Sequence, residues 1–162
     1  MAEVKIRPAT INDLKDIQNM NLKLFEKEIK EFDDTLNSNW TFGKEGTDYF
    51  EGRITEEDGC VLVACDDDKI IGYLSGGIHN EKISYRILPK FAELENMFIV
   101  EEFRNTGIGS MLCKNFAEWC KQKGVGRLRV VASSKNTNGI NFYKKNGFAD
   151  YDLVLEKDLN SN

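Results

Sequence analysis

A cation and two closely spaced glycines occur together in seven consecutive residues, Arg104-Asn105-Thr106-Gly107-Ile108-Gly109-Ser110. An apolar run that ends at Val100 precedes them and predicts a strand, and an amphipathic run over 108–123 predicts a helix. The first amides of a helix have no internal partner, and the helix dipole adds partial positive charge there. Because glycine lacks Cβ, a phosphate can approach the backbone closely. The stretch therefore predicts an anion site with Arg104 as a fixed cation, and the expected ligand carries a pyrophosphate.

Two better-known phosphate loops do not fit this stretch. A P-loop needs Gly-Lys-Ser or Gly-Lys-Thr after its glycines, and here the residues are Gly109-Ser110-Met111. A dinucleotide fingerprint needs a third glycine three positions later, where Leu112 stands. A glycine-bearing turn between a strand and a helix also occurs without any ligand, so the turn alone leaves that alternative open.

Two blocks of sequence give the turn a wider context. The first is Glu93-Leu94-Glu95-Asn96-Met97-Phe98-Ile99, followed by the turn itself. The second runs from Val131 to Asn136 and on to Ile140-Asn141-Phe142-Tyr143-Lys144-Lys145-Asn146-Gly147-Phe148. In this order and spacing, the two blocks resemble the acetyl-CoA-binding core of the GNAT superfamily of N-acetyltransferases. The resemblance implies an α/β (α+β) fold, in which a mixed, mostly antiparallel sheet is flanked by helices and a splayed strand pair holds acyl-CoA.

The resemblance also implies how the co-substrate, acetyl-CoA or coenzyme A, is held. Strand 91–99 is expected to splay from strand 127–132, and its open edge to hydrogen-bond the pantetheine amides. The Ile99 N–H is the candidate donor to the thioester oxygen. Asn136 is expected on the pantetheine arm, with the N-cap of the next helix as an equal alternative. The expected cofactor-binding residues are Met97, Phe98, Ile99, Arg104, Asn105, Thr106, Gly107, Ile108, Gly109, Ser110, Asn136 and Tyr143.

Three side chains are the catalytic candidates. By the resemblance, Tyr143 lies near the cofactor sulfur and protonates the departing thiolate; its alternative is a packed core aromatic. Glu93 matches a glutamate that some members use to deprotonate the amine through water. Glu95 lies two residues on, so both carboxylates share a strand face unless a bulge intervenes, and their proximity predicts that one pKa is raised. The alternative for both is a solvated strand residue.

The elements that position these residues follow from hydrophobic periodicity and turn signals. Strands are expected over 4–7, 60–65, 70–78, 91–99, 127–132 and 148–155, and helices after Thr10 and over 47–55, 108–123 and 137–145. Gly124 and Gly147 are expected to end the last two helices. His79 is expected as a turn or surface residue. Trp40, Phe42, Tyr49 and Phe50 form either an aromatic wall or a packed small core.

Composition excludes several classes of protein. The 162 residues, 41% hydrophobic, suit one domain over 1–162. A net charge of −5 argues against a nucleic-acid binder. We expect no membrane span, no signal peptide and no metal, because no apolar run is long enough and a lone histidine with four dispersed cysteines makes no zinc site. Buried, reduced cysteines indicate a cytoplasmic protein.

The resemblance to the GNAT superfamily implies an enzyme that moves an acetyl group from acetyl-CoA directly to a primary amine in a ternary complex. The alternative is a catalytically inactive CoA-binding sensor or interaction module of the same fold. The acceptor is open between a small-molecule amine, such as a polyamine, aminoglycoside or metabolite, and a protein amine. A homodimer is also left open. An acidic stretch after the first helix, from Glu26 to Asp34, could steer a cationic amine.

Overall fold

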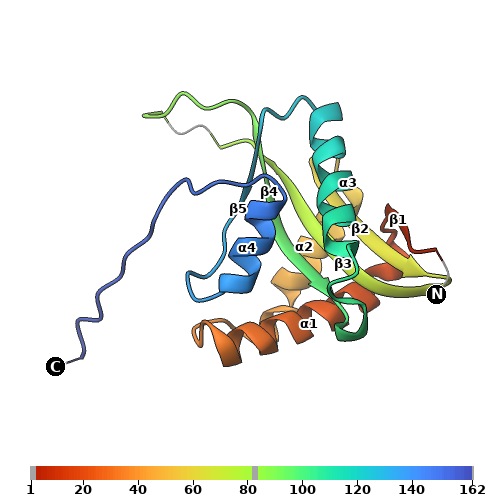
Figure 1. Cartoon of the computed structure of the whole chain (residues 1–162), viewed down its shortest axis with the longest axis horizontal. Helices are drawn as coiled ribbons and strands as arrows, with labels where there is room; N and C mark the ends of the chain where they lie inside the picture. The colour runs from red at the N-terminus through yellow and green to blue at the C-terminus, as the bar shows by residue number, and fades with distance from the viewer. Residues whose placement is uncertain (1–2, 82–83, 162) are drawn as a thin grey trace.

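A computed structural model describes residues 3–81 and 84–161 of the chain. Its central sheet has the strand order β1-β2-β3-β4-β5 (Figure 1). The strands are Lys5–Pro8, Gly59–Asp66, Lys69–His79, Phe91–Ile99 and Arg127–Val130 for β1 to β5. All neighbours are antiparallel except β4 and β5, which are parallel. The sheet is therefore mixed and mostly antiparallel, as the resemblance implied.

Helices cover both faces of this sheet (Figure 1). They are α1 at Leu14–Glu31, α2 at Lys44–Thr55, α3 at Ile108–Gln122 and α4 at Thr137–Lys145. Short 3-10 turns lie at Ile11–Asp13, Ser38–Trp40 and Glu101–Phe103. The α3 side of the sheet forms one apolar cluster around Leu74, Leu112 and Phe116, and the α1 and α2 side forms another around Ile17, Phe50 and Tyr73.

Local sequence signals account for most element boundaries. Thr10 and Asp13 form the expected capping box at the start of the first helical segment. Gly124 and Gly147 have φ values of +71° and +90°, the left-handed conformation expected of residues that end α3 and α4. The tight turn between β2 and β3 carries Asp67 at φ +51°. All four cysteines are buried free thiols.

The predicted strand over 148–155 is wrong. Residues 149–161 form no helix or strand, are exposed throughout, and lead away from the body of the molecule after α4 (Figure 1). Leu153, Val154 and Leu155 remain 76%, 82% and 83% exposed. The segment has the composition of a strand, but a strand also needs a neighbouring edge with which to exchange hydrogen bonds. Within the described chain it meets none.

Candidate active site

The turn between β4 and α3 has the geometry of an anion site. Asn105 and Gly107 adopt left-handed φ values of +61° and +91°. The first hydrogen bond of α3 runs from the Met111 N–H to the Gly107 carbonyl at 3.0 Å. The amides of residues 108–110 therefore have no partner within the described helix and project from its positive end. This arrangement supports the predicted pyrophosphate contact, which stays a prediction.

The two glycines of the turn serve different purposes, and this corrects the prediction that both make room for phosphate. A Cβ built on Gly107 meets no atom within 4 Å. A Cβ on Gly109 would lie 3.0 Å from the Phe142 ring and 3.3 Å from Ile99. Gly109 thus permits the start of α3 to pack closely against the Phe142 side chain of α4. Only Gly107 faces open space at the turn.

Arg104 is held at the end of β4. Its Nε donates to the Ile99 carbonyl at 2.9 Å, and its guanidinium carbon lies 5.4 Å from the centre of the Phe98 ring. These contacts fix the cation next to the turn. A contact between Arg104 and the pyrophosphate remains an expectation.

The strands β4 and β5 diverge where the resemblance places the cofactor. Their parallel pairing joins Phe91–Leu94 to Arg127–Val130 and ends there, although β4 continues to Ile99. On the other side of β4, the Val100 N–H donates to Ile71 in β3 at 2.9 Å. Because antiparallel strands alternate the direction of their amides, the Ile99 N–H points away from β3. It therefore faces the opening, as does the N–H of Met97.

The two candidate carboxylates lie on one side of the sheet, but each is paired with its own arginine. A register shift between β3 and β4 leaves Glu95 as the extra residue of a β-bulge. Arg53 in α2 donates to both Glu95 carboxylate oxygens at 2.8 and 2.6 Å. Arg129 in β5 donates to the Glu93 Oε2 at 3.1 Å.

The arginine pairing of Glu95 corrects the pKa prediction. Burial acts to raise the pKa of Glu95, but hydrogen bonds from Arg53 and Tyr49 outweigh it and bring the pKa below its ordinary value. Glu95 is therefore ionised at neutral pH and is a weak proton acceptor. The pKa of Glu95 is therefore not raised by a like-charge neighbour, because the Arg53 guanidinium lies against this carboxylate.

Sequence reasoning missed most of the polar network around Glu95. The Tyr49 hydroxyl donates to Glu95 Oε2 at 2.6 Å and receives a bond from Asn96 at 3.1 Å. Burial, and then the charge of Glu95, raise the pKa of Tyr49, so this phenol stays protonated. No local signal could have linked Arg53 and Tyr49 to a residue more than forty positions away in the sequence. Of the four aromatic residues, Trp40, Tyr49 and Phe50 form the packed core. Phe42 is 48% exposed and lies outside it. Tyr49 belongs both to this core and to the polar network.

His79 also belongs to this network, and its prediction as a turn or surface residue is wrong. It is the last residue of β3, where its Nε2 lies 3.3 Å from Glu95 Oε1. That distance allows an ion pair, but the angles are not those of a hydrogen bond, so the buried Nε2 has no hydrogen-bond partner among the described residues. The period-2 alternation from Ser75 through Gly77 to His79 is the signal that could have placed it on this face.

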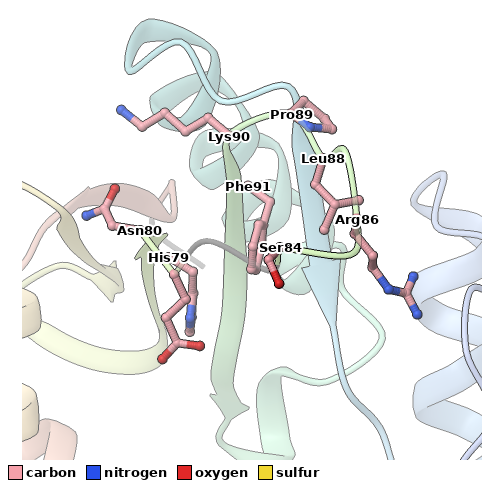
Figure 2. A pocket seen from close by; sticks show the side chains of 9 residues that line it. His79, Asn80, Ser84, Arg86, Leu88, Pro89, Lys90 and Phe91 are labelled. Carbon is pink, nitrogen blue, oxygen red and sulfur yellow. The ribbon is translucent and has the colours of Figure 1, made fainter.

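A hollow of about 390 Å³ opens beside His79 at the loop between β3 and β4 (Figure 2). The His79 ring stacks on Phe91 with centroids 5.4 Å apart and an interplanar angle of 9°. Glu81, Arg86 and Lys90 also line the hollow, so its charges are mixed. His79 therefore borders this hollow and also lies next to Glu95.

Tyr143 lies in the α4 layer on the opposite face. Its ring makes edge contacts with Phe142 and Phe148 at centroid distances of 5.2 and 5.5 Å. Burial, and to a lesser extent Cys113, raise the pKa of Tyr143, so the hydroxyl keeps its proton at neutral pH. A protonated phenol is the form that a general acid requires.

Asn136 is seen in one of its two predicted roles. Its side-chain oxygen accepts a hydrogen bond from the Gly139 N–H at 2.9 Å and caps α4. The other expected role of Asn136, a contact with pantetheine, stays a prediction.

The acidic stretch over 26–34 does not follow the first helix as expected, because α1 continues to Glu31 and contains its first part. Lysines in the same part of α1 balance its charge. Glu26 and Glu31 line a groove of about 1020 Å³ along α1, but Lys23, Lys27 and Lys30 line it as well. The groove is therefore mixed in charge and not an acidic rim. Among the described helices, none has the length and apolarity needed to cross a bilayer.

Comparison with known proteins agrees with this geometry. The Acetyltransferase (GNAT) family matches residues 22–148. The streptothricin acetyltransferase of Streptomyces lavendulae is 26% identical over 107 residues, which are 66% of this chain and 52% of that protein. The spermidine N(1)-acetyltransferase of Thermoplasma acidophilum is 29% identical over 105 residues, 62% of this chain and 60% of that protein. The chain thus spans between half and two thirds of the length of these relatives.

Solved structures show the same fold. The aminoglycoside N-acetyltransferase AAC(6')-Iy in complex with CoA superposes with a TM-score of 0.77 at 17% identity, covering 99% of this chain and 97% of that one. Together with the family match over most of the sequence, this places the protein among the α/β acyltransferase folds. The chain belongs to the Acetyltransferase (GNAT) family.

Proposed function

We propose that this chain transfers an acetyl group from acetyl-CoA directly to a primary amine within a ternary complex. The observation that carries the proposal is the opening between β4 and β5, which begins after Leu94 and lies next to the unpartnered amides of residues 108–110. An extended pantetheine arm could add to the exposed edge of β4 as a strand adds to a sheet. The pyrophosphate would then meet the start of α3.

The proposed chemistry divides between the two faces of the sheet. In this scheme the Ile99 N–H stabilises the thioester oxygen as negative charge develops on it. Tyr143, protonated at neutral pH, donates its proton to the departing thiolate. The attacking amine comes from the side of Glu93 and Glu95.

The two carboxylates receive different roles. Glu95, ionised and held by Arg53 and Tyr49, is a positioning residue that orients the amine or His79. Glu93 has one hydrogen bond from Arg129 and is the stronger candidate for proton removal through water. All four cysteines are buried free thiols, and burial raises the pKa of the Cys113 thiol to about 11. The scheme therefore does not use a cysteine as an acyl carrier.

The acceptor is proposed to be a small molecule with several amines. The relatives named for spermidine, streptothricin and aminoglycoside acetylation support this class. The carboxylates would bind the charged amines of such a compound. A protein amine is the competing acceptor.

A thiol-release assay with acetyl-CoA tests the proposal over a panel of polyamines, aminoglycosides and peptides. Initial rates at varied concentrations of both substrates should give intersecting double-reciprocal lines for a ternary complex. Parallel lines would indicate an acyl-enzyme and contradict direct transfer. CoA binding by calorimetry without turnover on any amine would instead support an inactive CoA-binding module.

A further inference from the structure

Glu28 in α1 is a partly buried carboxylate to which the scheme above gives no role. Lys27, the adjacent residue, pairs instead with Glu31 at 3.9 Å. Within residues 3–81 and 84–161, no side chain forms a hydrogen bond or an ion pair with Glu28. A charge taken partly out of water without a partner is costly to the fold, so Glu28 is a candidate functional group.

The periodicity of α1 directs Glu28 towards the sheet. Asn21 lies about two turns earlier on the same face of the helix. Asn21 is 0% exposed, and its side-chain amide donates to the Tyr73 hydroxyl of β3 at 3.0 Å and to Asn96 of β4 at 3.4 Å. Glu28 lies about 10 Å further along the helix axis. Because α1 runs from the side of the sheet with β1 towards the side with β5 and α4 (Figure 1), we expect Glu28 at the opening between β4 and β5.

Two tyrosines on opposite faces of the sheet are both affected by the charge of Glu28. Tyr73 belongs to the apolar cluster on the α1 side, and Tyr143 packs against the cluster on the other side. Burial contributes most to the raised pKa of each hydroxyl, and the negative charge of Glu28 adds to it in both. Because Coulomb interactions weaken with distance, the Glu28 carboxylate lies near both hydroxyls. The opening between β4 and β5 is the place where a carboxylate of α1 can act on Tyr143.

The two other carboxylates on the α1 side are already neutralised. Glu95 accepts two hydrogen bonds from Arg53, and Glu93 accepts one from Arg129. Each of these pairs has no net charge, so it attracts an ammonium group more weakly than a lone carboxylate does. Burial also raises the pKa of Glu28, which suits this carboxylate to accept a proton.

We propose that Glu28 binds the ammonium group of the acceptor and takes its first proton, a role that rests on the function proposed above. The neutral amine then forms the C–N bond with its lone pair while the C–S bond breaks, and the sulfur takes the Tyr143 proton. The surplus proton on the nitrogen leaves through water to Glu93. Solvent returns a proton to Tyr143 and removes the protons from the two carboxylates, so each transfer releases one proton.

Three variants test this role in the thiol-release assay with the panel of amines. Glu28→Gln should lower kcat/KM for the amine at least about tenfold, because a general base is lost. Glu28→Asp keeps a carboxylate and should restore part of that loss. The control is Glu51→Gln, which removes the same charge from an exposed position of α2 and should leave kcat/KM unchanged. Calorimetry should give the same Kd for CoA in all of them.

Urea unfolding separates this role from a structural one. Because burial raises the pKa of Glu28 above 4.5, its ionised form destabilises the fold as the pH rises above that value. The raised pKa is opposed by the charge of Lys27 and supported by that of Asp33. Glu28→Gln should therefore be at least as stable as the wild type at pH 7, and the difference should disappear below about pH 4. A variant that loses activity and stability together would make Glu28 a structural residue and overturn the proposal.

The rates of the wild type separate the two proposals. A wild type that acetylates an amine at the same rate as Glu28→Gln would overturn the role of Glu28 and leave the proposed function intact. A wild type that binds CoA but acetylates none of the amines would refute the proposed function, and the role of Glu28 with it.

Discussion

Gly107 and Gly124 offer a paired test of the cofactor site, because they lie at the two ends of α3 in the same backbone state. Their φ values are +91° and +71°, and a Cβ on either meets no atom within 4 Å. Alanine in this conformation costs about 1–2 kcal/mol of folding free energy. Both Gly107→Ala and Gly124→Ala should therefore lower the free energy of unfolding by similar amounts in urea titrations.

Only the first substitution should weaken CoA binding. The new methyl group at residue 107 would enter the space in front of the amides of residues 108–110, where the pyrophosphate is proposed to bind. Loss of one hydrogen bond to a charged group is worth about 1.5–3 kcal/mol, which is about ten- to 150-fold in Kd. Calorimetry should show this loss for Gly107→Ala, and an unchanged Kd for Gly124→Ala.

Equal CoA affinity in the two variants would refute the assignment of the turn. Gly109→Ala serves as a further control, because its Cβ would press on the Phe142 ring at 3.0 Å and not enter the proposed phosphate space. We expect it to lower stability more than it lowers affinity for CoA.

Three further predictions concern single side chains. Tyr143→Phe should reduce acetyl transfer at least about tenfold while calorimetric CoA affinity is retained; full activity would make the tyrosine a packing residue. Glu93→Gln should lower turnover by about 10²-fold or more, and a loss below about threefold would transfer the role to Glu95 or to water. Arg7 hydrogen-bonds Asp13 at 2.8 and 2.9 Å and lowers the pKa of Asp13 from 3.8 to about 2. Because that pKa is depressed on folding, the pair stabilises the protein above pH 4 by about 2 kcal/mol and loses this effect as the pH falls towards 2. Asp13→Asn should therefore be less stable than wild type at pH 7 in urea unfolding, and the difference should nearly vanish at pH 2; a constant difference would contradict this linkage.

Local signals predicted the elements of this fold well, because those signals lie within the elements themselves. The bounds of β4 and α4 agree with the hydrophobic pattern, and the left-handed glycines end the helices as expected. The strand predicted over 148–155 failed because pairing depends on an edge, and no property of the segment itself supplies one. Strand propensity describes how well the side chains of a segment fit a sheet, and does not say whether a free sheet edge lies next to that segment.

The candidate site also contains residues that the sequence could reveal and contacts that it could not. Residues of the turn could be found from sequence, because strand, glycines and helix start are contiguous. The partners of the carboxylates could not: Arg53 reaches Glu95 from α2, and Arg129 reaches Glu93 only because β5 lies parallel to β4. The sign of the pKa shift of Glu95 depends on those partners. The prediction from sequence neighbours alone, that closeness raises one carboxyl pKa, therefore had the wrong sign for Glu95.

The short pairing between β4 and β5 affects which part of the molecule opens most readily. Four residue pairs join β5 to the sheet, and none of the residues Thr137–Lys145 in α4 is fully buried. The segment 127–148 is therefore expected to open more readily than the hairpin of β2 and β3, and its amides to exchange hydrogen first. A CoA molecule bound between β4 and β5 would bridge the two parts, adding about 2.7 kcal/mol at a concentration one hundred times its Kd. Bound co-substrate would thus stabilise the attachment of β5 and α4 to the rest of the sheet, and its release would reverse the effect. Saturation with CoA should slow hydrogen exchange most strongly in β5 and α4.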